Sequence, residues 1–212
     1  MTSIPNAGQG PIVEEMAAVI VANKAWLSEI DGKIGDGDHG SNMAKGFGRA
    51  AERIRGQDMT LDAALLVLSD VLMSEIGGSM GPLYGLMFED MAGAIKDHER
   101  IDAAAFAAML NAGLAGVQTV GNAQVGDKTL IDALAPATHA FEAASHLGFA
   151  AALEAMTEAA EKGRDSTIDL VARIGRSSRL GERSRGVLDA GATSCCLILT
   201  SLGQSVRLRL SA

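Results

Sequence analysis

Apolar side chains recur every three or four residues along almost the whole 212-residue chain. After Thr60, for example, Leu61, Leu65, Leu68 and Leu72 fall on one side of a helix with 3.6 residues per turn. Aromatic residues make up only 3% of the chain, and its hydrophobic 48% is largely Ala, Leu, Ile, Val and Met. This composition favours closely packed helices over sheets. The sequence therefore predicts an all-α protein.

Eight helical segments are expected, and proline, glycine or capping residues mark their ends. Pro11 suits the first turn of the first helix, Thr60 is a suitable side-chain cap for the third, and the fifth follows Asp102. The segments fall at about residues 11–31, 41–54, 61–76, 83–95, 103–117, 129–147, 149–174 and 191–202. No strand pattern competes, although the final VRLRL alternates weakly. Short links between so many helices predict a barrel or bundle of eight antiparallel, up-and-down helices.

Length and charge exclude several classes of protein. We expect one domain over residues 1–212, with residues 1–10 as a flexible N-terminus. The net charge of -8 argues against a nucleic-acid partner. No stretch of about 20 apolar residues suggests a membrane span, and the polar start is unlike a signal peptide, so a cytoplasmic protein is expected. Cys195 and Cys196 are adjacent in an apolar run and are predicted to be buried thiols.

An acidic turn, DGKIGDGDHG, follows the first predicted helix. Its carboxylates Asp31, Asp36 and Asp38 share ten residues with four glycines, at a helix end that already carries negative partial charge. The carboxylates should repel that end and one another unless a cation offsets them. Mg²⁺ held by a few carboxylates usually keeps positions for substrate phosphates. The turn is therefore interpreted as a Mg-phosphate site, with a merely solvated acidic turn as the alternative.

Four further segments with unusual composition also lie between predicted helices. They are GGSMGPLYG at 77–85, GNAQVGDKTL at 121–130, GRSSRLGERS at 175–184 and DAGATS at 189–194. In an up-and-down bundle, alternate links emerge at the same end. The links after the first, third, fifth and seventh helices can therefore meet at one rim. We expect a pocket at one mouth of the bundle, open enough to admit a diphosphate and a base.

Three better-known motifs are approximated but rejected. The glycines of the acidic turn satisfy GxGxxG, but a dinucleotide fingerprint needs a preceding strand, and here a helix precedes. Residues 121–129 approach a P-loop, but Asp127 shifts Lys128 by one place and no strand leads in. An EF-hand fails because its twelfth position would be Asn42 or Phe47 and not the required Glu.

Taken in order, IGDGDHGSNM, GPLYG, GDKT, LGERS and GATS resemble the nucleotide-binding L subunit, or L domain, of the dihydroxyacetone kinases, from about residue 27 to 194. The resemblance implies a barrel of eight antiparallel helices that holds ADP or ATP through two Mg²⁺ ions. It implies Asp31, Asp36 and Asp38 as the metal ligands. The residues that it places around the nucleotide are His39, Gly40, Ser41, Asn42, Ser79, Met80, Gly121, Leu130, Arg176, Asp189, Ala190 and Gly191, with Lys128 and Thr129 as possible additions.

Several of these residues also have a purely structural interpretation. Thr129 could simply cap the sixth helix, Lys128 could be solvated, and Leu130 could be an ordinary core residue. Arg176 could belong to a solvated basic loop that balances an acidic protein. The sequence also departs from the family where Met80 precedes GPLYG, where Arg179 replaces an aromatic residue, and where Ala190 replaces a proline. These departures affect the shape of the pocket and leave the acidic triad intact.

The resemblance also implies a mechanism with partners. This chain has no separate triose-holding domain, so it is more similar to a free-standing subunit. For such a subunit, a phosphohistidine donor of the phosphotransferase system recharges bound ADP, and the γ-phosphoryl passes to dihydroxyacetone on a K subunit. No catalytic side chain is assigned beyond the metal-nucleotide site. The alternatives are an ATP-exchanging kinase subunit for another ketose such as erythrulose, and an ADP-sensing regulatory protein that docks on a transcription factor.

Overall fold

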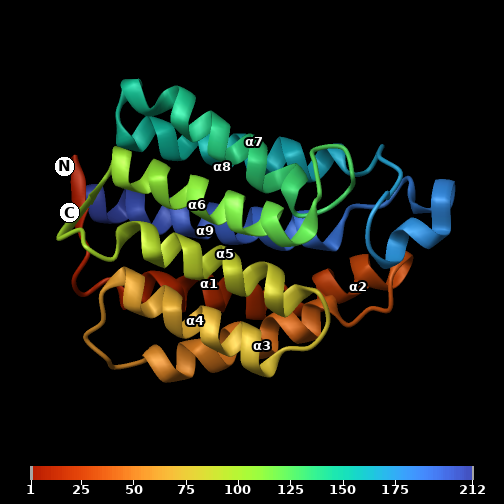
Figure 1. The fold of residues 1–212 in the computed structure, drawn as a ribbon, viewed down its shortest axis with the longest axis horizontal. Coiled ribbons are helices and arrows are strands. Elements are labelled where there is room, and N and C mark those ends of the chain that lie inside the picture. The colour runs from red at the N-terminus through yellow and green to blue at the C-terminus, as the bar shows by residue number, and fades with distance from the viewer. Residues whose placement is uncertain (1, 212) are drawn as a thin grey trace.

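The computed structural model describes residues 2–211 as a bundle of antiparallel helices (Figure 1). The α-helices in this part of the chain are α1 (Gly10–Ala22), α2 (Lys24–Ile34), α3 (His39–Ile54), α4 (Leu61–Glu75), α5 (Met80–Ile95), α6 (Ala103–Gly121), α7 (Ile131–Ala144), α8 (Phe149–Ser166) and α9 (Ala190–Ser211). Two 3-10 segments, η1 (Ser145–Leu147) and η2 (Arg176–Ser184), and two short strands, β1 (Ser3–Pro5) and β2 (Arg100–Asp102), complete the order. The predicted all-α bundle is confirmed.

Helices that follow one another in the chain lie side by side. The closest neighbours are α4 with α5, α5 with α6, and α7 with α8, which is the pattern of an up-and-down bundle. Helix α9 returns to pack against α1, α7 and α8. The connections α2–α3, α4–α5, α6–α7 and α8–α9 therefore gather at one end, on the right in Figure 1, as the alternation of links predicted.

The predicted Thr60 cap is present, and Asp102 caps a second helix. The Thr60 side chain accepts a hydrogen bond from the Ala63 N–H at 3.3 Å, and the Asp102 side chain accepts one from the Ala105 N–H at 2.9 Å. Each satisfies one of the backbone N–H groups that the first turn of a helix leaves without a partner.

Two predicted helices are interrupted or end well before their expected bounds. The first breaks into α1 and α2 at Asn23, whose side-chain amide donates to the Val19 carbonyl oxygen at 2.8 Å and so competes with the helical ladder. The seventh was expected to reach Ile174, but α8 ends at Ser166. Past Ser166 the backbone N–H groups bond to the residue three positions back, as Leu170 does to the Thr167 carbonyl oxygen at 3.3 Å, and Lys128 Nζ binds the carbonyl oxygens of Thr167 and Leu170.

The N-terminal residues expected to be flexible instead take part in the fold. Ile4 is fully buried, and β1 pairs antiparallel with β2, with Ile4 opposite Ile101. The Asn6 side chain accepts from the Leu61 N–H at 3.0 Å and donates to Asp62 at 2.8 Å, which ties this segment to the start of α4. The amide side chain of Asn6 thus supplies contacts that the polar composition of the segment does not indicate.

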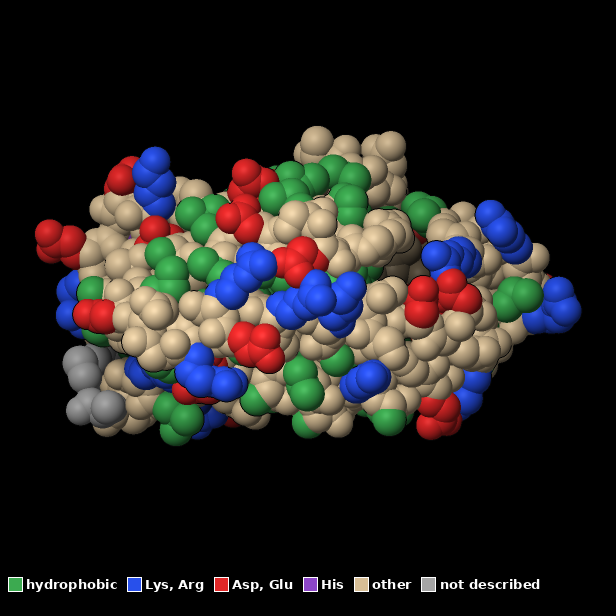
Figure 2. All heavy atoms as spheres, turned by 90° about the horizontal axis from the view of Figure 1, so that it is seen from below, with side chains coloured by type: hydrophobic (Ala, Val, Ile, Leu, Met, Phe, Trp, Pro, Cys, Tyr) green, Lys and Arg blue, Asp and Glu red, His purple; other side chains and the backbone are tan. Residues whose placement is uncertain are grey.

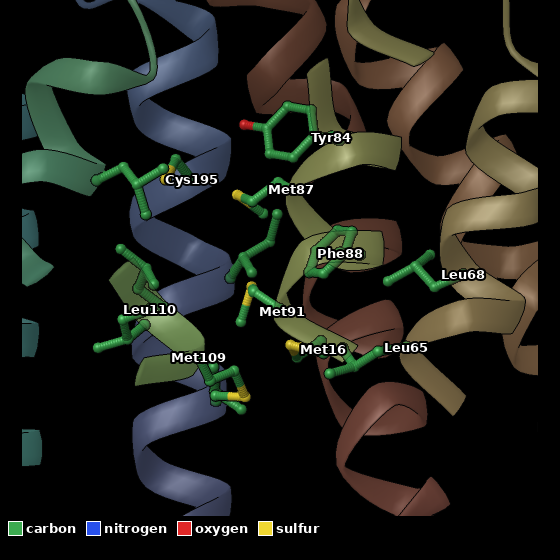
Figure 3. Packing of buried hydrophobic residues seen from close by; sticks show 14 of the residues in the cluster. Met16, Leu65, Leu68, Tyr84, Met87, Phe88, Met91, Met109, Leu110 and Cys195 are labelled. Carbon is green, nitrogen blue, oxygen red and sulfur yellow. The ribbon is translucent and has the colours of Figure 1, made fainter. Parts of the chain in front are cut away.

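The core is rich in methionine and poor in aromatic rings. Figure 3 shows Met16, Met87, Met91 and Met109 between α1, α5, α6 and α9. Flexible thioether side chains fill irregular gaps between closely spaced helices.

Both cysteines are free and buried, as expected. Helix α6 is the one helix of residues 2–211 that is long and apolar enough to cross a membrane, and it packs between α5 and α7 as the core helices of soluble proteins do.

Substitution of Gly163 is predicted to destabilise the bundle. Gly163 is buried where α8 meets α7, and a Cβ atom there would collide with the backbone carbonyl oxygen of Asp132. Gly163→Ala should lower the free energy of unfolding by about 1–3 kcal/mol through overpacking. Gly93→Ala is the matched control, since an added Cβ there meets open space; it should raise stability by up to about 1 kcal/mol through helix propensity. Urea unfolding of both variants checks the prediction, and equal effects of the two substitutions would contradict it.

Candidate nucleotide and metal site

A cavity of about 720 Å³ lies at the end of the bundle where the four connections meet. Its walls come from the α2–α3 turn, the start of α5, the α6–α7 loop and the α8–α9 connection. On the face shown in Figure 2, acidic and basic side chains are interspersed, and both kinds lie at the end that carries these connections. The predicted pocket at one mouth is therefore present, and its size suits a small organic ligand.

The three acidic residues converge on one side of this cavity. Ligand oxygens of Asp31, Asp36 and Asp38 all lie within 4.8 Å of one another. The chain makes this convergence possible at Gly37, whose φ of +79° belongs to the left-handed region that glycine adopts without strain. The Asp31 carboxylate accepts a hydrogen bond from the His39 N–H at 3.2 Å, which joins the end of α2 to the first turn of α3.

The positive charge nearest the triad comes from Arg176 in η2. Its guanidinium forms an ion pair with the Asp36 carboxylate. The pair brings the basic α8–α9 connection across the pocket to the acidic turn. Both side chains stay substantially exposed, so the pair contributes little to stability and can exchange partners. Arg176 is thus placed where it can reach an anionic ligand.

A buried chain of hydrogen bonds supports the wall beside the triad. The Tyr84 hydroxyl lies 2.7 Å from Ser194 Oγ and donates to the Gly191 carbonyl oxygen, 3.0 Å away. Ser194 Oγ lies 2.9 Å from Nε2 of His39. Figure 3 shows the Tyr84 hydroxyl directed toward α9. Burial lowers the pKa of His39, and the nearby Asp31 carboxylate opposes this shift, so the ring favours its neutral form.

Asp189 occupies the turn that leads into α9. Its carboxylate accepts from the Ala192 N–H at 2.7 Å, as a helix cap does. Burial raises the pKa of Asp189 to about 7, the Ala192 N–H opposes that shift, and the Asp132 carboxylate adds to it. The carboxylate therefore changes charge near neutral pH while it lines the cavity.

The α6–α7 loop is held by a buried carboxylate. Asp132 accepts from the Gly126 N–H at 2.6 Å and from the Thr129 N–H at 2.7 Å. The Thr129 hydroxyl accepts from the Ile131 N–H at 3.2 Å, so Thr129 does support the start of α7. Lys128 is only 1% exposed, and the structure contradicts the interpretation of a solvated lysine. Leu130 is buried at the cavity wall.

Nearly all of the predicted site residues line this cavity. Gly40 and Ser41 do not. Gly40 lies against α2, where a Cβ atom would collide with the Lys24 carbonyl oxygen, so it permits close packing of α3 on α2. Ser41 is exposed on the first turn of α3. The residues that do line it are Asp31, Asp36, Asp38, His39, Asn42, Ser79, Met80, Gly121, Lys128, Thr129, Leu130, Arg176, Asp189, Ala190 and Gly191.

Sequence reasoning missed other members of the site. Tyr84 lines the cavity, and Ser194 supports it from behind. Tyr84 lies inside the GPLYG segment and Ser194 inside the GATS segment. The sequence therefore indicates the segments to which these residues belong but not their individual roles. The apolar residues Leu83, Val120 and Ile174 also line the cavity and gave no signal of their own, because their spacing matches ordinary helical packing.

The donor atoms at this site fit magnesium. Three carboxylates supply hard oxygen ligands, and no thiolate belongs to the group. The His39 N–H at the start of α3 binds the Asp31 carboxylate, so this helix N-terminus faces the acidic residues, and a helix N-terminus favours phosphate. Apolar side chains on the walls suit a planar base.

Comparison with known proteins identifies the family. The DAK2 domain model matches residues 33–204, and the chain belongs to this family. The ADP-binding subunit DhaL of PEP-dependent dihydroxyacetone kinase 1 from Listeria innocua is 37% identical over 185 residues, which cover 86% of this chain and 88% of that protein. The resemblance inferred from the motifs is thereby confirmed.

Longer relatives contain the same unit. The L-erythrulose 1-kinase of Mycolicibacterium smegmatis is 31% identical over 215 residues, which cover 96% of this chain but 38% of that protein. The crystal structure of the dihydroxyacetone kinase from C. freundii in complex with AMP-PNP and Mg²⁺ superposes with a TM-score of 0.72 at 27% identity, over 92% of this chain and 33% of that chain. These relatives are kinases or kinase subunits by name.

The raised pKa of Asp189 predicts a pH-dependent stability. Because its folded-state pKa of about 7 exceeds the ordinary value of 3.8, the stability linked to this group is full below about pH 4 and is lost as the pH rises to about 7. The loss corresponds to a slope of up to about 1.4 kcal/mol per pH unit. Asp189→Asn keeps a cap oxygen for Ala192 and should flatten this slope, whereas Asp97→Asn, at an exposed position, should not. Denaturant unfolding between pH 4 and 8, without metal or nucleotide, makes the comparison. Parallel profiles for wild type and Asp189→Asn would refute the assignment.

Proposed function

We propose that this chain is the nucleotide-binding phosphotransferase subunit of a dihydroxyacetone kinase. In this proposal it holds ADP or ATP with two Mg²⁺ ions, and the γ-phosphoryl passes to a hydroxyl oxygen of dihydroxyacetone, or of a similar small ketose, on a partner K subunit. The hydroxyl proton is released. A phosphohistidine donor then transfers its phosphoryl group from nitrogen to the terminal oxygen of the bound ADP. The whole of residues 1–212 is assigned to one L domain with these roles.

One observation carries the proposal: three carboxylates converge within 4.8 Å at the edge of a cavity that also contains Arg176 and the first turn of α3. Carboxylates alone would repel a diphosphate. The same triad with bound Mg²⁺ would attract it and would neutralise charge that develops on the phosphates during transfer. The relatives named as ADP-binding subunits, and the AMP-PNP and Mg²⁺ complex of a longer relative, support this assignment.

The side chains of the pocket have separable roles in this proposal. Asp31, Asp36 and Asp38 would hold the metals, and the N–H groups at the start of α3 would donate to phosphate. Arg176, already paired with Asp36, would move to a phosphate oxygen. Leu130 would lie against the base. Transfer between phosphates needs positioning and charge stabilisation more than a side-chain nucleophile.

The acceptor could instead be erythrulose. The similarity to an L-erythrulose 1-kinase over nearly the whole of this chain favours that alternative. The chain corresponds to 38% of that protein, so ketose recognition could lie outside the matched part. We place the subunit in the cytoplasm, as expected from the sequence analysis.

The function is tested by reconstitution. The purified chain is combined with ADP, Mg²⁺, a K subunit and a phosphohistidine donor, and phosphorylation of dihydroxyacetone and of erythrulose is followed. We expect turnover only in the complete mixture, and none from this chain with ATP and Mg²⁺ alone. Turnover by the chain alone would refute the relay. Nucleotide binding without transfer in any mixture would favour the ADP-sensing regulator.

Removal of one metal ligand is predicted to abolish nucleotide binding without loss of the fold. Asp38→Asn, and likewise Asp36→Asn, should eliminate Mg²⁺-dependent ADP binding, because the remaining carboxylates cannot complete the coordination. The metal-free variant should be at least as stable as wild type, since one source of like-charge repulsion is gone. Calorimetric titration with ADP and Mg²⁺ measures the binding, and Asp97→Asn serves as the control. An unchanged affinity for ADP with Mg²⁺ in both triad variants would contradict the assignment of these aspartates as metal ligands.

Bound ADP is predicted to leave slowly. A diphosphate held through metals to three carboxylates, by helix N–H groups and by apolar contact with the base must break several contacts together to escape. The protein should therefore purify with ADP, and labelled free ADP should exchange more slowly than turnover. Heat denaturation followed by chromatography of the supernatant detects the nucleotide. A nucleotide-free protein that exchanges label within seconds would favour the ATP-exchanging alternative.

A further inference from the structure

Lys128 is the buried cation of the site, and nothing in the proposed transfer uses it. Its ammonium lies 2.6 Å from the Thr167 carbonyl oxygen, 3.2 Å from that of Leu170 and 2.5 Å from that of Val187. A lysine ammonium has three N–H donors, and these three acceptors account for all of them. A lysine whose donors are fully used by the backbone has none left for a phosphate.

The three carbonyl groups belong to the connection that carries the far wall of the pocket. Leu170 and Thr167 follow α8, and Val187 precedes the turn at residues 189–191. The Asp189 N–H donates to Thr167 Oγ1 at 3.0 Å, so the residue that Lys128 binds also binds the turn. The ammonium therefore links both ends of a segment that has no regular helix outside η2.

The lysine itself is anchored at its base. Its backbone φ of +64° is left-handed, a conformation that costs energy for a residue with a side chain. The neighbouring N–H groups of Gly126 and Thr129 are both held by the Asp132 carboxylate. One end of Lys128 is thus fixed to the start of α7, and the other end is fixed to the α8–α9 connection.

On the basis of the proposed function, we infer that Lys128 is a positioning residue for the nucleotide: it fixes the Asp189–Gly191 turn against Leu130 and does not contact phosphate. The turn lies close to Leu130: a Cβ atom added at Gly191 would be 3.4 Å from the backbone nitrogen of Leu130. Loss of the ammonium would leave three carbonyl groups without this donor, and the turn would move away from Leu130.

The test compares Lys128→Met with Lys162→Met, the same change at an exposed lysine of α8. Affinities for ADP and AMP with Mg²⁺ are measured by calorimetry, together with Mn²⁺ binding in the absence of nucleotide. Lys128→Met should weaken the binding of ADP and of AMP by a similar factor of about tenfold or more. The displaced pocket wall would act on the adenosine portion, which both nucleotides share. Mn²⁺ affinity should stay within about twofold of wild type, since the triad does not touch Lys128. A loss confined to ADP would overturn the inference, because it would place Lys128 on the phosphates.

Amide hydrogen exchange provides a readout that does not depend on nucleotide binding. In Lys128→Met, exchange at residues 186–192 should become faster while exchange at residues 31–42 stays as in wild type. Unchanged exchange at 186–192 would overturn the inference whether or not the protein binds nucleotide. Failure of wild type to bind ADP would instead count against the proposed function alone.

A second pair of variants covers the case in which Lys128→Met does not fold. Thr167→Val removes the hydroxyl that accepts from Asp189 and that donates to the Arg164 carbonyl oxygen at 2.6 Å, whereas Thr167→Ser retains it. Thr167→Val should reproduce the faster exchange at 186–192 and weaken ADP and AMP equally, by a smaller factor of roughly threefold, since fewer hydrogen bonds are lost. Wild-type behaviour of Thr167→Val would contradict the part of the inference in which Thr167 connects Lys128 to the turn at residues 189–191.

Discussion

The hydrogen bond from the His39 N–H to the Asp31 carboxylate fixes the turn on which the acidic site depends. The turn joins the C-terminal end of α2, which carries negative partial charge, to the N-terminal end of α3, which carries positive partial charge. Carboxylates at the C-terminal end of α2 interact unfavourably with the negative partial charge there, but they also face the positive partial charge at the N-terminal end of α3. With Arg176 on Asp36, the fold thus offsets part of the repulsion within the triad and leaves it able to accept a cation.

The helices were predictable from the sequence because apolar spacing and capping residues act locally. Thr60 caps the helix that it was expected to cap, and the helix expected after Asp102 begins there. The errors arose where a distant or polar contact overrides local pattern. Asn23 interrupts a continuous apolar stripe through its own amide. Beyond the end of α8, the Thr167 carbonyl group is bound by Lys128, which lies nearly forty positions away in the sequence. Such contacts leave no periodic signal.

The site was predictable to the level of segments, and less so to the level of individual roles. The order of the five segments indicated which residues surround the cavity, and only Gly40 and Ser41 lie outside its wall. Lys128 illustrates the limit. A lysine beside Asp127 and Thr129 is typical of a solvated or phosphate-facing side chain, and nothing in the local sequence shows that three carbonyl groups surround its ammonium. Its burial follows from how α7 and the α8–α9 connection pack.

In the turn at residues 189–191, hydrogen bonds from other segments take the place of the backbone constraint that a proline would provide. The resemblance implies a proline where this chain has Ala190, and proline would fix the backbone φ by its ring. Without the ring, the order of the turn must come from its neighbours. Thr167 accepts from the Asp189 N–H, and the Tyr84 hydroxyl binds the Gly191 carbonyl oxygen. Tyr84 also reaches His39 through Ser194, so the wall of the pocket and the acidic turn are connected by one chain of hydrogen bonds. This chain of hydrogen bonds does not include Lys128, so it can hold the first residue of α3 in place when the Lys128 contacts to the other end of the connection are lost.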